Sequence, residues 1–147
     1  MIINVVDFEK ITNVYKPYLD GVKEINTKRD EFITKLEPIR KEMQEIIKSL
    51  TSKIEVPGED KQAKEIKYNE LQENAIALDE EFKTLAKEMK DSLNAKTFDE
   101  LSIMIDEFIE GKDIDIVIGK MEVVFVKPNF EITDDIVDLL RSKNLAD

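Results

Sequence analysis

The chain has 147 residues, of which 41% are hydrophobic and 37% charged, and its formal net charge is -11 at pH 7. A surface this acidic argues against a general affinity for nucleic acid or for anionic membranes, because binding to either needs a basic surface that displaces counterions. The chain contains neither cysteine nor histidine, which excludes disulfides, thiolate chemistry and any site that depends on an imidazole.

The N-terminal residues predict a strand followed by a short helix. Ile2–Val6 is a dense, largely β-branched run, typical of a strand buried on both faces. Asp7 can cap a helix from Phe8 to about Tyr15, because its carboxylate accepts a hydrogen bond from a free N–H of the first turn. Pro17 and Gly21 predict a loosened junction before the next element.

Residues from about Leu19 to Leu93 predict two antiparallel helices with a coiled-coil seam. Apolar residues recur at alternating steps of three and four, which places them on one face of each helix. Val56–Asp60 separates the two series and contains Pro57 and Gly58, which favour a turn. The seam residues are Val22, Ile25, Phe32, Leu36, Ile39, Met43, Ile46, Leu50 and Ile54, then Leu71, Ala75, Leu78, Phe82, Leu85, Met89 and Leu93.

Pro38 lies inside the first of these helices. A proline there removes one backbone hydrogen bond and clashes with the preceding turn, at a cost of about 3 kcal/mol. The apolar seam nevertheless continues in phase through Ile39 and Met43. We therefore predict a kink at Pro38 rather than a helix end. Two separate helices that meet at Glu37 are the alternative.

The returning helix is expected to continue toward a broader apolar face. Thr97 and Glu100 have the spacing of a capping box, so a break is possible there. Gly111 is expected to end the helix as a C-cap glycine. The broader face, formed by Phe98, Leu101, Ile105, Phe108 and Ile109, predicts packing against the rest of the protein.

The C-terminal part predicts a β-hairpin and a last helix. Ile114–Ile118 and Met121–Val126 flank Gly119-Lys120, the pattern of two strands joined by a type II′ turn. Pro128 would end the second strand. Thr133 is expected to be the N-cap of the last helix, whose buried face would comprise Ile136, Val137, Leu139 and Leu140.

These elements predict an α+β fold with two parts. Residues 19–96 form a long antiparallel helical hairpin with its tip at 56–60, and residues 1–18 and 97–147 form a small β-rich body from which the hairpin projects. Three short strands leave two open sheet edges, so we expect several copies to close their sheets on one another. The residues expected at this self-association surface are Ile2, Ile3, Val5, Val6, Ile114, Ile116, Ile118, Val124 and Val126.

The order of elements and two sequence blocks resemble the Skp (OmpH-like) family of trimeric holdase chaperones. Asp113–Ile118 and Val123–Ile136 are similar to the family's closing block, in which a hydrophobic strand pair leads into a Pro-containing turn and an Ile-Thr-Asp helix start. Ile2–Phe8 resembles the opening block. The two helical arms match only as heptads.

This resemblance implies a homotrimer with an intersubunit β-barrel and three arms around a cavity. The cavity would hold unfolded or partly folded client proteins, classically outer-membrane proteins, without ATP or any cofactor. Family members are typically basic and carry a signal peptide, and this acidic chain departs from both features. Binding to lipopolysaccharide or membrane is therefore not expected of it.

Client binding would use apolar side chains off the seam. Ile33, Ile47, Val56 and Tyr68 have this placement. The alternative is that each of them broadens the packing of the hairpin itself or supports a contact between arms.

The sequence as given shows no signal peptide and no apolar run near the roughly 20 residues that cross a bilayer. It therefore predicts a cytoplasmic protein, or a periplasmic one if a signal sequence has been removed. No enzyme, metal site or cofactor is expected, because the carboxylate pairs lie on exposed helix positions and glycine-rich phosphate loops are absent. Two further functions remain open. One is a structural assembly component, for example of a virus particle, and the other is a prefoldin-like chaperone.

Overall fold

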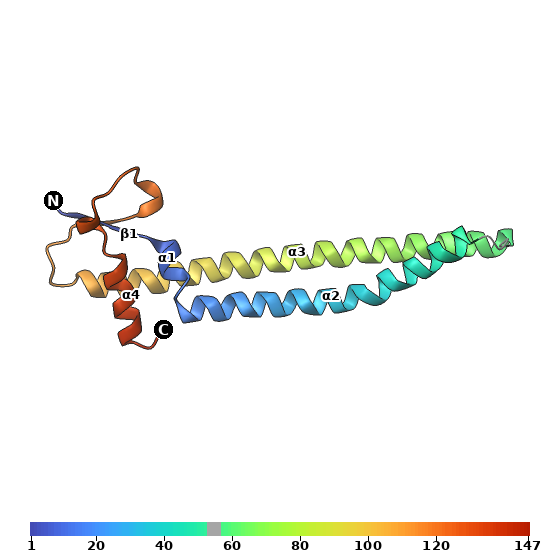
Figure 1. Cartoon of the computed structure of the whole chain (residues 1–147), viewed down its shortest axis with the longest axis horizontal. Coiled ribbons are helices and arrows are strands. Elements are labelled where there is room, and N and C mark those ends of the chain that lie inside the picture. The colour runs from blue at the N-terminus through green and yellow to red at the C-terminus, as the bar shows by residue number, and fades with distance from the viewer. Residues whose placement is uncertain (53–56) are drawn as a thin grey trace. The chain divides into compact units, whose positions relative to one another are not determined.

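A computed structural model describes residues 1–52 and 57–147 (Figure 1), which form two compact units. We call Met1–Glu24 with Lys90–Asp147 the body, and Ile25–Met89 the arm. The two long helices, α2 (Lys16–Thr51) and α3 (Gly58–Ile109), contribute residues to both units. Val56, predicted to contact clients and to begin the turn at 56–60, lies outside the described residues.

The core of the body is formed by α1 (Phe8–Thr12), α4 (Thr133–Ser142), strand residue Val6 and the C-terminal part of α3. The broad apolar face predicted after Thr97 contributes Leu101 and Ile105 to this core. The predicted buried face of the last helix is confirmed for Ile136, Val137 and Leu140, whereas Leu139 is only half-buried.

The cap of the first helix is confirmed, but the helix is shorter than predicted. Asp7 Oδ1 accepts a hydrogen bond from Lys10 N at 3.1 Å, and α1 ends at Thr12 rather than near Tyr15. The predicted loosened junction is wrong, because Pro17 and Gly21 both lie in α2. Pro17 occupies the first turn of α2, where its missing N–H removes no helical hydrogen bond.

The sheet differs from the predicted one. It has two strands, β1 (Ile3–Val6) and β2 (Ile116–Gly119), which run parallel with Ile3 opposite Ile116 and Val6 opposite Gly119. The predicted hairpin is wrong. A type II′ turn needs a positive φ at its glycine, but Gly119 has φ -65° and leads into a 3₁₀ turn, η1 (Lys120–Glu122).

The segment predicted as the second hairpin strand, Met121–Val126, therefore forms no strand. Its first two residues belong to η1, and the others lead toward a second 3₁₀ turn, η2 (Pro128–Phe130). The far side of β1 is covered by the residues after η2, since Ile132 N donates to Val5 O at 2.9 Å and Val5 forms a bridge with Glu131. A single chain thus forms less β-structure than the three strands expected of it.

The returning helix is continuous. α3 passes through Thr97 and Glu100 without the break that their capping-box spacing allowed, and Thr97 is only 3% exposed. The helix ends at Ile109, and Gly111 follows with φ +75°, as predicted for a C-cap glycine.

The last helix begins one residue earlier than a Thr133 N-cap requires. Thr133 is its first residue, and the N-cap position is held by Ile132. The buried Thr133 hydroxyl accepts a hydrogen bond from Asp7 N at 2.9 Å and donates one to Glu131 Oε1 at 3.1 Å. The side chain expected to cap α4 therefore joins α4 to the start of α1.

The arm is an antiparallel helix pair with the predicted seam. Phe32 faces Phe82 with ring centroids 5.2 Å apart, and Ser49 accepts a hydrogen bond from Lys64. Later residues of α2 therefore contact earlier residues of α3, as in an antiparallel pair. Phe32, Leu36 and Leu71 are buried. The described seam residues that remain in the arm, Ile25, Ile39, Met43, Ile46, Leu50, Ala75, Leu78, Phe82, Leu85 and Met89, are half-buried.

α2 contains Pro38 in its interior and is one helix, not two that meet at Glu37. Figure 1 shows its ribbon changing direction along the cyan stretch. Helix α2 therefore accommodates the proline within a continuous run from Lys16 to Thr51.

Candidate client-binding and self-association surfaces

Two of the residues predicted to bind clients lie together in the arm. Ile47 of α2 and Tyr68 of α3 line one groove with Leu50, Glu65 and Asn69. Ile47 is 44% exposed, whereas Tyr68 is half-buried. The groove therefore offers an apolar floor with a carboxylate and an amide beside it.

Ile33 lies outside this groove, at an equally exposed position two heptads earlier on α2. Ile66 and Ile76 of α3 are more exposed still, at 53% and 52%. Sequence analysis missed these two, although an isoleucine outside the three-and-four spacing of the seam is the signal that would have found them. The arm thus exposes isolated isoleucines on both helices.

The predicted self-association residues fall into three groups. Val5 and Val6 are buried within their own chain, at 3% and 0% exposed, where they already have packing partners. Ile2, Ile116 and Val124 are exposed to solvent. The half-buried members are Ile3, Ile114, Ile118 and Val126.

The segment that begins in η1 and leads toward η2 is the most exposed apolar segment of the body. Met121 is 86% exposed, Val124 is fully exposed and Phe125 is 77% exposed. We call these three residues the apolar loop. Met121 and Phe125 were not among the predicted self-association residues. Both lay in a predicted strand, and no signal in the sequence marked them as more exposed than their neighbours.

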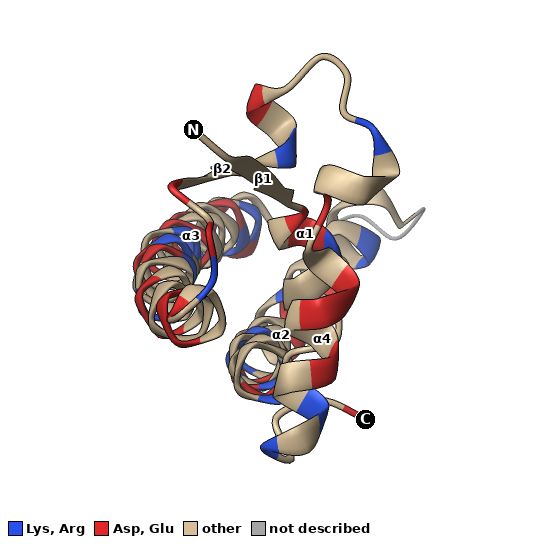
Figure 2. Ribbon diagram, turned by 90° about the vertical axis from the view of Figure 1, so that its left-hand side faces the viewer, with Lys and Arg blue, Asp and Glu red and all other residues tan. Residues whose placement is uncertain are grey.

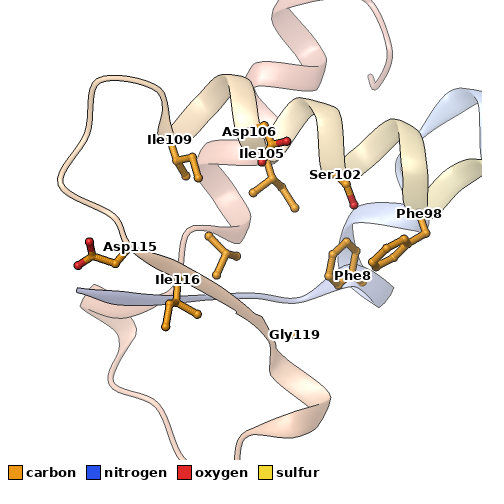
Figure 3. A pocket seen from close by; sticks show the side chains of 10 residues that line it. Phe8, Phe98, Ser102, Ile105, Asp106, Ile109, Asp115, Ile116 and Gly119 are labelled. Carbon is orange, nitrogen blue, oxygen red and sulfur yellow. The ribbon is translucent and has the colours of Figure 1, made fainter. Parts of the chain in front are cut away.

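A second apolar surface of the body is a groove between α3 and β2, drawn in Figure 3. Phe98 is 57% exposed and leans on Phe8, with ring centroids 5.6 Å apart. We call this site the Phe98 groove. It is lined by Phe8, Phe98, Ser102, Ile105, Asp106, Ile109, Asp115, Ile116, Val117 and Gly119.

Two carboxylates give the Phe98 groove a negative edge. Asp106 comes from α3 and Asp115 from the residue before β2, and both are exposed. Asp115 Oδ2 accepts a hydrogen bond from Ile2 N at 2.7 Å, which holds the N-terminus against the start of β2. An apolar ligand that carries a positive charge would suit this groove better than an acidic one.

Tyr15 has a strongly raised pKa, and its role is structural. Burial, together with a hydrogen bond donated to Glu100, raises the pKa of Tyr15 far above its ordinary value. Tyr15 is 2% exposed and lies between α1 and α2, so it stays neutral and ties this junction to α3. Its position in the core gives it no access to a ligand.

The described residues include no group of three acidic side chains placed to hold a metal ion. Within the same residues no helix is both long enough and apolar enough to span a membrane. Acidic and basic residues are interspersed along the ribbons of α2 and α3 (Figure 2). The surfaces that stand out are therefore apolar: the isoleucines of the arm, the apolar loop and the Phe98 groove.

Comparison with known proteins gives a family and a fold. The family model described as outer membrane protein (OmpH-like) matches residues 2–140. A crystal structure from Caulobacter crescentus CB15, described as that of a candidate outer membrane chaperone (OmpH-like), is similar with a TM-score of 0.68 and 15% sequence identity. The match covers 96% of this chain and 84% of that one. No curated protein matches the sequence.

Proposed function

The chain belongs to the OmpH-like family of outer membrane proteins, and from this premise we propose that it is an ATP-independent holdase chaperone. It works as a homotrimer, and its arms bind unfolded or partly folded proteins. The observation that carries the proposal is the set of isolated, exposed isoleucines on an otherwise charged helix pair.

These isoleucines suit weak, sequence-tolerant binding. Ile33, Ile47, Ile66 and Ile76 are each between 44% and 53% exposed. Burying apolar surface contributes about 25 cal/mol per Å², so each residue adds little and none selects a particular sequence. An unfolded chain offers many apolar side chains, and several such contacts together hold it while each remains easily broken.

The net charge of -11 adds a preference among clients. Basic or positively patched segments are attracted to the arms, and salt weakens that attraction. The same charge disfavours contact with lipopolysaccharide or anionic membrane. A role in the periplasm, where outer-membrane proteins pass in an unfolded state, belongs to the same proposal.

Self-association is supported by the body. Ile116, Val124 and Phe125 expose large apolar surfaces that a monomer would leave in water, and clusters of this kind mark contacts with other proteins. Trimerisation would remove them from solvent and bring three arms together. The half-buried positions of β2 provide a further strand edge for pairing between copies.

The proposal is tested by diluting an unfolded, aggregation-prone protein into buffer at low salt and following light scattering. The wild-type protein is expected to suppress aggregation at stoichiometric concentration. A variant that replaces Ile33, Ile47, Ile66 and Ile76 by serine should lose most of this effect. A matched control replaces four exposed charged residues of the arm, Lys41, Glu45, Glu73 and Lys87, by serine and leaves the net charge unchanged.

Equal suppression by the two variants would show that the isoleucines are not part of the binding surface. No suppression by the wild-type protein would overturn the holdase function itself. In that case, co-purification with one partner at fixed stoichiometry would indicate an assembly component instead.

A further inference from the structure

We propose that the arm holds its clients on one face only, and that the occupant of this face is an extended, uncharged apolar segment of an unfolded protein. Ile33, Ile47, Tyr68 and Ile76 belong to this face, which we call the isoleucine face. The inference rests on the holdase function proposed above and assigns the side of the arm that performs it.

A groove in the arm shows which sides of the two helices point the same way. Ile47 and Leu50 of α2 line this groove together with Glu65, Tyr68 and Asn69 of α3. Leu50 belongs to the seam, so the groove lies directly beside the seam, on one of the two sides of the helix pair. Residues in line with Ile47 on α2 and with Asn69 on α3 therefore share that side.

Two further isoleucines lie on those lines. An α-helix turns by about 100° per residue, so residues seven apart point within about 20° of each other. Ile33 precedes Ile47 by two such steps, and Ile76 follows Asn69 by one. Ile33, Ile47 and Ile76 are between 44% and 52% exposed. One side of the arm therefore carries three half-exposed isoleucines beside Tyr68.

The opposite face of the arm is acidic. Glu45 lies two residues before Ile47 and Glu70 two residues after Tyr68, which places each carboxylate about 200° around its helix from the isoleucine face. Steps of seven or eleven residues return to nearly the same direction and add further carboxylates. The residues of this acidic face, all exposed, are Glu31, Glu42, Glu45, Glu70, Glu81 and Glu88.

The charges of the two faces are balanced differently. On the acidic face, only Glu31 has an ion-pair partner within the part of the chain that the structure describes, namely Lys28 at 3.2 Å. Close to Ile76, by contrast, Asp79 pairs with Lys83 at 2.8 Å. Covering the acidic face would take unpaired carboxylates out of water, which costs free energy, whereas an uncharged segment on the isoleucine face buries mainly apolar surface. This difference selects an uncharged apolar occupant and the face that receives it.

Pro38 lies on the acidic side as well. It stands seven residues after Glu31 and seven before Glu45, in line with both. Because proline has no N–H, the carbonyl of Thr34 lacks its helical donor in α2. This free polar group therefore lies on the side that remains in water, and not beneath the bound client.

The first test uses the absence of native cysteine and a matched pair of amide side chains on α3. Gln72 lies four residues from both Tyr68 and Ile76, whereas Asn74 lies four residues after Glu70 on the acidic face, and both amides are exposed. In Gln72→Cys and Asn74→Cys, alkylation by iodoacetamide is timed with and without a cysteine-free unfolded client. Where the client occupies about nine-tenths of the arms, alkylation of Gln72→Cys should slow about tenfold. The rate for Asn74→Cys should not change.

The second test uses two isoleucines of equal exposure on one helix. Ile66 and Ile76 are 53% and 52% exposed, but Ile66 lies two residues before Tyr68, about 200° around the helix from the isoleucine face. Ile76→Ser should raise the protein concentration needed for half-maximal suppression of aggregation about threefold, because it removes apolar area from the client contact. Ile66→Ser should leave that concentration unchanged. Both side chains are half-exposed, so neither substitution is expected to unfold the arm.

The outcomes separate this inference from the proposed function. Wild-type protein that suppresses aggregation, together with equal slowing of Gln72→Cys and Asn74→Cys by the client, would overturn the single face and leave the holdase function intact. Slow alkylation of Gln72→Cys before any client is added would also overturn it, because another arm would then cover this face. A wild-type protein without effect on aggregation would overturn both proposals.

Discussion

The body and the arm bury their apolar residues in different ways. In the body, Val6, Ile11, Leu101, Ile136 and Leu140 are completely buried in one cluster. In the arm, the best-buried side chains keep between 5% and 8% of their surface exposed, and most of the seam is half-buried. A pair of helices can enclose a side chain on one side only, so the arm spreads its stability over many weak contacts while the body concentrates it.

The largest effect is expected when one leucine in each unit is replaced by alanine. Leu101→Ala removes a side chain that is 0% exposed and should lower the free energy of unfolding by about 2–5 kcal/mol, because a cavity remains. Leu78→Ala in the half-buried seam of the arm should cost about 1–2 kcal/mol, since less apolar area is lost. Urea titrations followed by circular dichroism measure both. Equal losses would contradict the difference between the units.

A pair of glycines gives the next largest effect, with opposite signs. A Cβ at Gly21 in the body would collide with the Leu93 side chain, whereas a Cβ at Gly58 in the arm meets nothing within 4 Å. Gly21→Ala should therefore destabilise by about 1–2 kcal/mol through overpacking, and Gly58→Ala should stabilise by up to about 1 kcal/mol through helix propensity.

The double variant Gly21→Ala with Leu93→Ala is the control for the Gly21→Ala prediction. Removing the leucine side chain makes room for the new Cβ, so the combined loss should be smaller than the sum of the two single losses. Strictly additive losses in urea unfolding would show that the loss caused by Gly21→Ala does not come from its contact with Leu93.

The arm could be predicted almost completely from the sequence. Its signal is local, because a three-and-four spacing of apolar residues depends only on the geometry of a single helix. The described seam positions are buried or half-buried as expected, with Phe32 against Phe82. Ile66 and Ile76 were not predicted as exposed, although both lie outside the three-and-four spacing of the seam.

The body could not be predicted to the same extent. Residues near Gly119 carry the local pattern of a hairpin, but β1 supplies a parallel partner for Ile116–Gly119 from more than a hundred residues away. Such pairing leaves no mark in the local sequence. The hydroxyl of Thr133 is a second example. It was predicted to cap α4, but it accepts a hydrogen bond from Asp7 N, which is distant in the sequence. The Phe98 groove likewise depends on how α3 and β2 meet. Phe98, Ile105 and Ile109 were predicted to pack against the rest of the protein, whereas Ile116 was predicted to lie at the self-association surface.

A smaller effect, confined to high pH, is expected at Tyr15 in the body. The folded protein holds the pKa of Tyr15 above its ordinary value of 10.0, chiefly by burial. Its contribution is complete below pH 10, and above that pH the unfolded state releases the proton while the folded state keeps it. Stability should therefore fall as pH rises beyond 10, by up to about 1.4 kcal/mol per pH unit.

Tyr15→Phe isolates this contribution. The variant should lack that part of the alkaline loss, so the difference in stability between wild type and variant should shrink from pH 9 to pH 11 in urea titrations. A constant difference across this range would show that Tyr15 ionises at the same pH in both states, and that its burial does not affect its titration.

The smallest effect is expected where the body and the arm do not differ. Lys10 pairs with Asp134 in the body at 2.9 Å, and Lys83 pairs with Asp79 in the arm at 2.8 Å, but all four side chains are more than half exposed. The Lys10 ammonium lowers the pKa of Asp134, so any gain would be present above the unfolded pKa and lost as pH falls through the folded one. Solvent screens exposed pairs of this kind. Lys10→Ala and Lys83→Ala should therefore leave the urea midpoint unchanged at pH 7, and a clear loss in the body alone would show that its charges, like its apolar side chains, are better shielded from water than those of the arm.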